Sequence, residues 1–372
     1  MKNILINGIA ANSGGGKSIL SNFLSILREK NSSYCFIILV PTISDYSIYS
    51  SRNIKIIEIP KVSGLLHLLI FYYSSINKII VKYKIDLVFN LADVIIPNKE
   101  IKQLFLFDWP YAVYPNSIVW KKMDFKSFVL RRIKVFMFKK YSYYPKVIYC
   151  QTNSIRNRLG KYYSTQKLDI IPNAVAIDNI GGGEYKNFNF PENKKKFLCL
   201  SKYYSHKNLE IFLKVAEEIR KKKLPFLIIL SLDKKECRAA NSLLTKIKKQ
   251  ELEDVILNVG SVQMKNVPAL YKQCDALLLP TLLESFSGTY VEAMYHKKPI
   301  FTSDMDFAKE VCGDAAFYFN PLDCNSVINS MLEINNLGKV SFAREKGTER
   351  LNNMLGWDKV TDKILLEFNK YI

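Results

Sequence analysis

Short β-branched runs alternate with amphipathic stretches of helix length along the whole chain, and this alternation limits the possible folds more than any other feature. Repeated strand and helix pairs are typical of parallel sheets that carry helices on both faces. The pattern predicts strands at residues 4–7, 35–40, 54–57, 86–89, 103–107, 147–150 and 169–171, and again at residues 197–201, 226–231, 255–259, 276–279, 299–302 and 316–319.

The alternation stops between residues 177 and 196, a turn-rich stretch with a run of three glycines and a run of three lysines, which is typical of a domain boundary. We therefore predict the class α/β, with two facing, Rossmann-like, doubly wound domains that bind ligands at the carboxyl ends of their strands. The predicted parts are an N-terminal domain (1–176), a linker (177–196), a C-terminal domain (197–355) and a C-terminal helix (356–372) that packs back on the first domain.

Composition excludes several classes of protein. The chain has 372 residues, of which 48% are hydrophobic and 24% charged, unlike disordered, collagen-like or coiled-coil proteins. Its seven cysteines lie far apart and it has three histidines, so we expect no disulfide framework and no metal site. The N-terminus is predicted to be a strand rather than a signal peptide, and the apolar run 65–73 is shorter than the ~20 residues of a membrane span. We expect a cytoplasmic protein.

The formal net charge of +20 is concentrated in the first half of the chain. Residues 1–180 hold 25 basic and 10 acidic side chains, whereas residues 181–372 hold 29 and 24. Such a positive field favours an anionic partner, which could be a polyphosphate ligand, an anionic membrane or nucleic acid. The simpler explanation is that the whole sequence is rich in lysine. Because no nucleic-acid-binding motif is present, we expect no nucleic acid partner.

The most informative segment is PTLLESFSGTYVEAM, which follows a predicted buried strand and opens a helix. Glu284 is predicted to lie in the loop at the carboxyl edge of the sheet. Ser287 fits the N-cap position, which leaves the amide groups of Gly288 and Thr289 free to bind an anion. Glu292 lies one turn further on, where its carboxylate can bind the hydroxyl groups of a ribose. The segment predicts a nucleotide diphosphate site, although Glu292 on a solvated helix face is the simpler alternative.

Two lysines support this prediction. Lys202 and Lys207 follow the predicted strand 197–201 and precede a predicted helix, so they belong to the same edge of the sheet. Their ammonium groups can neutralise a diphosphate as point charges.

These residues resemble glycosyltransferase family 4, the group 1 glycosyltransferases with the GT-B fold. Glu284 and Glu292 match the two glutamates of the E-x7-E signature, and further agreement lies in segments 171–174, 260–271 and 302–315. The resemblance implies a retaining transfer of a sugar from a nucleotide-diphosphate donor to a glycan or lipid-linked acceptor, in the biosynthesis of lipopolysaccharide, capsule or another surface polysaccharide. It implies no metal and no cofactor besides the nucleotide sugar as co-substrate.

The resemblance also implies roles for single residues. Glu284 would contact the donor sugar as a catalytic residue and Glu292 would hold the ribose. Lys207 matches the lysine of the family, whereas Lys202 stands where arginine is usual. The donor would further contact Phe286, Ser287, Gly288 and Thr289. The usual Gly-Phe-Gly is Ser-Phe-Ser at residues 285–287, so the donor sugar is not predicted.

A glycine-rich segment follows the first predicted strand. Gly14, Gly15, Gly16, Lys17 and Ser18 fit a relaxed phosphate-binding loop that lacks its first glycine, and a P-loop NTPase or kinase is therefore the alternative function. The resemblance implies instead a substrate-binding loop at residues 14–16. A purely structural turn is the third reading.

Asp108 follows the strand predicted at 103–107, in a neighbourhood where many family members have a histidine. Asp108 either replaces that histidine as a catalytic residue or caps the turn before Pro110. Both readings stand on the sequence alone.

The segment from Trp120 to Lys140 combines apolar residues at helical spacing (125, 128, 129, 133, 136 and 137) with basic ones (131, 132, 134, 139 and 140). A helix that turns its apolar stripe to the core and its basic side to water is one reading. The other is a surface drawn to anionic lipid, which would place the enzyme peripherally on the inner face of the cell membrane.

Overall fold

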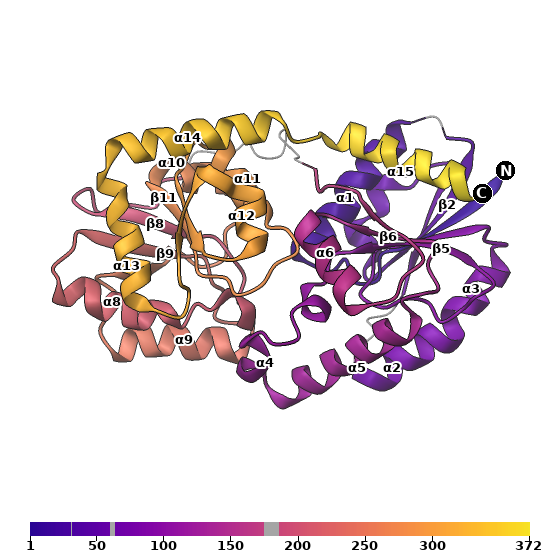
Figure 1. Cartoon of the computed structure of the whole chain (residues 1–372), viewed down its shortest axis with the longest axis horizontal. Helices are drawn as coiled ribbons and strands as arrows, with labels where there is room; N and C mark the ends of the chain where they lie inside the picture. The colour runs from indigo at the N-terminus through magenta and orange to yellow at the C-terminus, as the bar shows by residue number, and fades with distance from the viewer. Residues whose placement is uncertain (31, 60–63, 175–185) are drawn as a thin grey trace. The chain divides into compact units, whose positions relative to one another are not determined.

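The computed structural model describes residues 1–30, 32–59, 64–174 and 186–372. The chain forms two compact α/β units, each with its own parallel sheet (Figure 1). The first unit comprises Met1–Asn116, Met123–Val175 and Leu355–Ile372, and the second comprises Ser117–Lys122 and Ala176–Met354. The predicted class, α/β with two doubly wound domains, is confirmed.

The first unit contains a seven-stranded sheet in the order β3-β2-β1-β4-β5-β6-β7. Its strands are β1 (Lys2–Asn7), β2 (Tyr34–Val40), β3 (Ile54–Glu58), β4 (Leu87–Asn90), β5 (Lys102–Phe107), β6 (Val147–Cys150) and β7 (Leu168–Ile170). Its helices include α1 (Gly14–Glu29), α2 (Gly64–Ile70), α3 (Ile76–Lys82), α5 (Phe125–Tyr141), α6 (Asn153–Tyr162) and α15 (Trp357–Tyr371). The strand order reverses between β1 and β4, where the loops after these strands diverge and open a ligand crevice in folds of this type.

The second unit contains a six-stranded parallel sheet in the order β10-β9-β8-β11-β12-β13. Its strands are β8 (Lys195–Cys199), β9 (Phe226–Leu230), β10 (Ile256–Asn258), β11 (Ala276–Leu279), β12 (Ile300–Ser303) and β13 (Ala316–Phe319). Its helices include α4 (Val119–Lys122), the short η5 (Ser205–Lys207), α8 (Ile211–Lys221), α9 (Arg238–Lys249), α10 (Val267–Gln273), α11 (Gly288–Tyr295), α12 (Asp306–Cys312), α13 (Cys324–Leu332) and α14 (Leu337–Asn352). The order reverses between β8 and β11.

Each predicted strand is present within a few residues of its expected bounds, because continuous apolar runs are what a doubly covered parallel strand requires. In β4 and β11, for example, all four residues are buried. Part of the predicted linker 177–196 lies outside the described residues, and its end overlaps β8, which begins at Lys195.

The C-terminal helix α15 packs on the first unit, as predicted, next to α1. The rings of Phe368 and Phe89 meet edge to face with their centroids 5.4 Å apart. The hydroxyl group of Tyr149 donates a 2.6 Å hydrogen bond to the carboxylate of Glu367. The last helix therefore closes the core of the domain in which the chain begins.

Helix α5 confirms the helical spacing of its segment, but a core-facing position for Phe125 and Phe136 is wrong. Phe125 is 81% exposed and Phe136 is 65% exposed. The buried residues of α5 are Met137, Phe138 and Tyr141 instead. Apolar residues lie on more than one side of this helix, so only part of them reaches the core.

The basic segment predicted from Trp120 to Lys140 is also divided between the units. Trp120 is 8% exposed and α4 clusters with the second unit, whereas α5 belongs to the first. The predicted segment is therefore shared between the two units.

Residues Gly64–Lys82 form one continuous helix, in which α2 and α3 are joined by the π-helical turn η3 (Phe71–Ser75). It is longer than the apolar run predicted from the sequence. By length and composition alone it is able to cross a membrane, and it is the one such helix in the part of the chain that the structure describes.

Candidate functional site

The loops after β8 and β11 meet at the point where the strand order of the second sheet reverses. The ammonium group of Lys207, at the end of η5, makes an ion pair and hydrogen bond with the carboxylate of Glu284, in the loop after β11. Their side chains are 13% and 12% exposed, respectively. The structure thus brings together two residues that the sequence placed at the same edge, and the charge of each compensates the other in a poorly solvated place.

Two further residues fix the position of Glu284. Thr281, which is fully buried, donates from Oγ1 to the carboxylate over 3.1 Å. The Nε2 atom of His206 lies 4.0 Å from the same carboxylate oxygen. Neither residue was among the predicted site residues. The only signal for Thr281 was its position directly after the turn that ends a buried strand.

The start of helix α11 is open towards a ligand. Ser287 occupies the N-cap position, as predicted, but its side chain makes no capping hydrogen bond, so the first amide groups of the helix keep their capacity to donate. A Cβ atom added to Gly288 would meet no other atom within 4 Å. Open space beside free amide groups at the positive end of a helix suits an anionic group.

Glu292 lies one turn inside α11 and does not lie on a solvated helix face. Burial raises the pKa of its carboxyl group to about 7, from an ordinary value of 4.5. Tyr271 of α10, which is fully buried, donates from its hydroxyl group to the carboxylate over 3.3 Å. A half-buried carboxylate that accepts from the Tyr271 hydroxyl group retains acceptor capacity for the hydroxyl groups of a ligand.

The remaining predicted donor residues are less closely tied to this cluster. Lys202 is exposed, in the loop between β8 and η5. Phe286 and Thr289 are half-buried on either side of the N-cap residue. Their proximity in sequence to Lys207 and Glu284 places them at the same sheet edge, and the carbonyl group of Thr289 accepts a 3.3 Å hydrogen bond from the hydroxyl group of Tyr271.

The short segment 117–122 packs with the second unit, which the sequence did not predict. The ammonium group of Lys122 donates to the side chain of Asn208, the residue that follows η5. Asn208 is almost fully buried, has a left-handed backbone (φ 57°) and donates to the carbonyl group of Pro321 over 2.7 Å. These contacts fix the turn that carries Lys207.

In the first unit, the glycine-rich segment forms the turn between β1 and α1, and α1 begins at Gly14. Lys17 makes a 2.8 Å ion pair with Asp45, and both side chains are more than a third exposed. In a P-loop the corresponding lysine reaches back over the loop to the phosphates. The position of Lys17 therefore disfavours the NTPase reading.

Asp108 lies beside this loop. Its Oδ2 atom is 3.9 Å from the place where a Cβ atom would stand on Gly16. Burial and the nearby carboxylate of Asp93 raise the pKa of Asp108 to about 7. Asp93 is itself held by the ammonium group of Lys134 over 2.5 Å. The structure thus joins two predicted features of the first domain, the glycines and Asp108, in one place.

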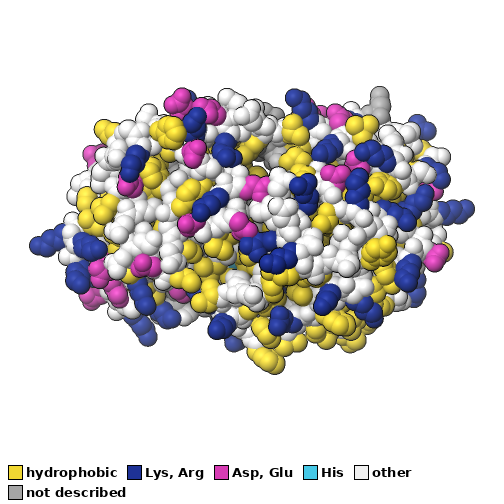
Figure 2. All heavy atoms as spheres, in the orientation of Figure 1, with side chains coloured by type: hydrophobic (Ala, Val, Ile, Leu, Met, Phe, Trp, Pro, Cys, Tyr) yellow, Lys and Arg dark blue, Asp and Glu magenta, His cyan; other side chains and the backbone are white. Residues whose placement is uncertain are grey.

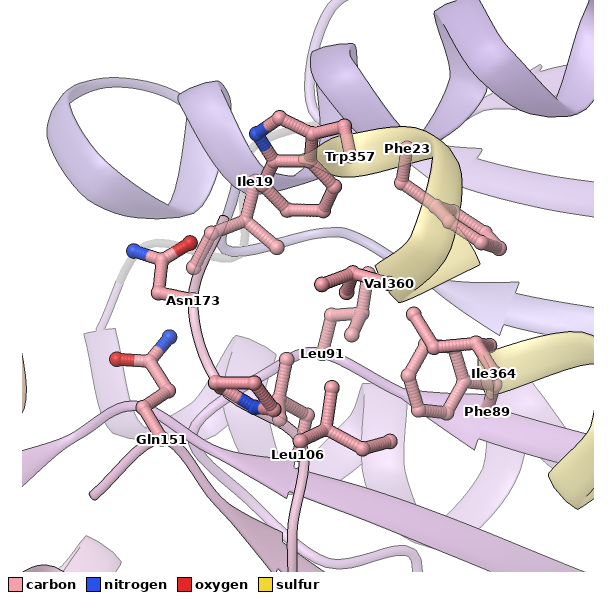
Figure 3. A pocket seen from close by; sticks show the side chains of 12 residues that line it. Ile19, Phe23, Phe89, Leu91, Leu106, Gln151, Asn173, Trp357, Val360 and Ile364 are labelled. Carbon is pink, nitrogen blue, oxygen red and sulfur yellow. The ribbon is translucent and has the colours of Figure 1, made fainter. Parts of the chain in front are cut away.

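A small cavity lies in the core of the first unit between α15 and the ends of several strands (Figure 3). Trp357, Val360 and Ile364 of α15 line one side, and the amide groups of Gln151 and Asn173 lie at another (Figure 3). Most of its lining is apolar. It offers few groups for chemistry and is best described as a packing defect below α15.

Among the described residues, no three histidine, cysteine or acidic side chains lie close enough to hold a metal ion. The seven cysteines are free thiols.

Comparison with known proteins adds to this geometry. Residues 184–338 match the family model described as Glycosyl transferases group 1. The matched segment lies within the second unit, which carries Glu284 and Lys207. The O-antigen chain mannosyltransferase RfbU of Salmonella typhimurium is 24% identical over 227 residues, which cover 60% of this chain and 58% of RfbU. The chain thus spans somewhat more than half the length of the curated relatives it matches.

Solved structures resemble the whole chain. Sucrose-phosphate synthase from Thermosynechococcus elongatus has a TM-score of 0.78 at 13% identity, covering 100% of this chain and 99% of that chain. HepE from Anabaena, in complex with UDP and glucose, has a TM-score of 0.70 at 13% identity and covers both chains fully. These likenesses show the fold, which is GT-B.

Proposed function

We propose that the protein is a retaining glycosyltransferase of family 4, which moves a sugar from a nucleotide-diphosphate donor to a glycan or lipid-linked acceptor. The observation that carries this proposal is the largely buried pair of Glu284 and Lys207, next to the open start of α11, inside the segment that matches the group 1 model. The carboxylate of Glu284 suits the hydroxyl groups of a sugar, and the ammonium group of Lys207 with the helix start suits the anionic group from which that sugar departs.

In the proposed reaction the bond between the anomeric carbon and the diphosphate breaks, and the acceptor oxygen bonds to the same face of the sugar. The proton of the acceptor hydroxyl group passes to the departing diphosphate oxygen. The amide groups of Gly288 and Thr289, with Lys207 and Lys202, stabilise the negative charge that develops on the departing diphosphate. Glu284 binds the sugar and stabilises positive charge at its anomeric carbon. Fixed donors of this kind supply the stabilisation that a metal would otherwise give, so we propose no metal and no further cofactor.

The remaining donor and acceptor contacts are proposed on the same basis. Glu292, with its half-buried carboxyl group, holds the ribose, and Phe286 and Ser287 flank the sugar. In the first unit, Asp108 and the loop Gly14–Gly16 contact the acceptor. Because RfbU is named as an O-antigen chain mannosyltransferase, we place the activity in the assembly of a surface polysaccharide, on the cytoplasmic side.

The proposal is tested by thermal stabilisation and by turnover. UDP, GDP or their sugars should raise the melting temperature in the presence of a chelator, and ATP with magnesium should not. Glu284→Gln should keep nucleotide binding and lose at least about a thousandfold in sugar transfer or donor hydrolysis. The matched control is Glu333→Gln, on a partly exposed side chain that pairs with Lys339. Stabilisation by ATP with magnesium alone, or an active Glu284→Gln variant, would contradict the proposal.

A further inference from the structure

The helix Gly64–Lys82 of the first unit has an outward face that is unusually apolar. Leu66 is 68%, Ile70 49%, Tyr73 48% and Val81 77% exposed. They lie three to eight residues apart, so that much of the helix presents apolar groups to the outside. Only 28% of its most apolar 18-residue window is buried. Clusters of exposed apolar side chains on one element mark interaction sites.

The opposite face of this helix is part of the core. Leu68, Phe71, Tyr72, Ile76 and Ile80 are each at most 8% exposed. If the helix crossed a bilayer, these side chains would have to leave the core of the first unit. The structure therefore favours a helix that lies on a surface with its outer face inserted, rather than one that spans.

Helix α5 adds a basic and aromatic edge to this face. The hydroxyl groups of Tyr73 and Tyr141 share a hydrogen bond, and their rings are 6.3 Å apart, which joins the two helices side by side. On α5, Arg132, Phe136 and Lys139 are exposed at spacings of four and three residues. Figure 2 shows hydrophobic and basic side chains mixed along the lower edge of this unit, where α2 and α5 lie in Figure 1.

Positive charge predominates in the segments that carry this surface, although Asp124 caps α5 and Asp93 pairs with Lys134 on it. Residues 59–85 and 125–168 together contain fifteen lysines and arginines and no aspartate or glutamate. A second copy of the chain would bring two such faces together in a symmetric contact, with like charges opposed. Nucleic acid would leave the apolar side chains without a partner. A bilayer that contains anionic lipid satisfies both the apolar and the basic part.

We infer that the outer face of helix Gly64–Lys82, with Arg132, Phe136, Lys139 and Lys140 of α5, docks the first unit on an anionic membrane surface. Leu66, Ile70 and Tyr73 enter the boundary between headgroups and acyl chains, and the basic groups of α5 bind lipid phosphates. This surface differs from the segment that the sequence suggested, because it uses an apolar helix far upstream of α5. It does not depend on which sugar is transferred or on whether transfer occurs.

The test is sedimentation of the full chain with vesicles of phosphatidylcholine alone or mixed with phosphatidylglycerol. We expect binding to the anionic vesicles that weakens as salt rises. Replacing three charges together (Arg132→Gln, Lys139→Gln, Lys140→Gln) should weaken it by about a hundredfold. The double variant Leu66→Ser, Ile70→Ser should weaken it by about tenfold.

Two control variants match these changes elsewhere on the molecule. Leu337→Ser with Leu366→Ser removes two exposed leucines, and Lys214→Gln with Lys234→Gln and Lys235→Gln removes three exposed charges. Both controls should bind vesicles like the unchanged chain, and the surface variants should keep its melting temperature and its oligomeric state.

The inference is overturned if anionic vesicles do not bind the chain, or if the surface variants bind as well as the controls. Retention of the unchanged chain on vesicles after an alkaline carbonate wash would overturn the interfacial arrangement in favour of a spanning helix. Variants that change only the oligomeric state would assign the face to a second copy instead. Sugar transfer to a soluble acceptor is measured in parallel, so that a failed vesicle test and a failed glycosyltransferase proposal are distinguished.

Discussion

The two units share a sheet topology but carry different charges at the points where their strand order reverses. In the second unit a carboxylate, Glu284, is neutralised by the buried ammonium group of Lys207 beside an open helix start. In the first unit Asp108 and Asp93 lie near each other, next to a glycine-rich loop. Topology thus fixes where a ligand binds, whereas the side chains decide its kind. Under the proposed function, the second unit binds an anionic leaving group and the first unit binds hydroxyl groups of the acceptor.

After Glu284→Gln, the largest effect on sugar transfer should come from replacing the two lysines of the second unit one at a time. Lys207→Met removes a buried cation and should lower sugar transfer by about a hundredfold or more, because a single fixed donor at a developing anion is worth that much. Lys202→Met removes an exposed charge and should lower it only a few-fold. Steady-state kinetics of both variants, with melting temperatures to confirm folding, check this. Equal losses would mean that burial does not decide which lysine acts.

The carboxyl pair of the first unit predicts a dependence on pH. Because burial and Asp93 raise the pKa of Asp108 to about 7 from 3.8, Asp108 is protonated below neutral pH and ionised above it. If the ionised form accepts a hydrogen bond from the acceptor hydroxyl, kcat/KM for the acceptor should rise through about pH 7. Asp108→Asn should abolish this rise of kcat/KM with pH and lower activity by about tenfold or more.

Asp93→Asn sharpens this test. Removal of the neighbouring negative charge should lower the pKa of Asp108, so the rise of kcat/KM should move to lower pH without disappearing. A profile that stays in place in both variants would leave Asp108 as a turn cap only.

The sequence predicted which residues lie at the two sheet edges better than it predicted the contacts between their side chains. β8 and β11 are continuous apolar runs, and the residues after neighbouring parallel strands must share an edge, so Glu284 and Lys207 were expected near each other. That Lys207 reaches the carboxylate itself, and that Thr281 donates to it, depends on loop conformation, which carries no periodic signal.

Helix α5 and segment 117–122 were harder to predict for a different reason. Hydrophobic spacing reports which residues avoid water, and it does not tell a core from any other apolar environment. One of the two readings of this segment therefore placed Phe125 and Phe136 in the core, a position that Phe138 and Tyr141 occupy instead. The packing of 117–122 on the second unit is a long-range contact without a local pattern.

We expect replacement of Glu292 to have opposite effects on the stability of the fold and on binding of the nucleotide. Its pKa is about 7 in the fold and ordinarily 4.5, so the folded chain binds the proton more tightly and the ionised form destabilises it. This destabilisation is absent below pH 4.5, grows as pH rises and is complete above pH 7.

Glu292→Gln keeps an acceptor for Tyr271 and carries no charge. It should be more stable above pH 7 by up to about 3 kcal/mol, and equally stable near pH 4.5. Binding of the nucleotide should weaken by about tenfold, because hydrogen bonds from ribose to a charged acceptor are lost. Urea unfolding at two pH values and calorimetric titration with UDP measure the two effects, and a variant that is less stable at high pH would contradict the assignment.

The smallest effect is expected at Lys17, and it tests the comparison between the units most directly. Lys17 pairs with Asp45 where both side chains are more than a third exposed, and such pairs contribute about 0–1 kcal/mol. Lys17→Ala should therefore leave stability nearly unchanged and sugar transfer within about twofold, whereas a phosphate-binding lysine would be indispensable. A large loss of activity in Lys17→Ala, with none in Lys207→Met, would move the anion site from the second unit to the first, because the cation that matters would then stand beside the glycine loop.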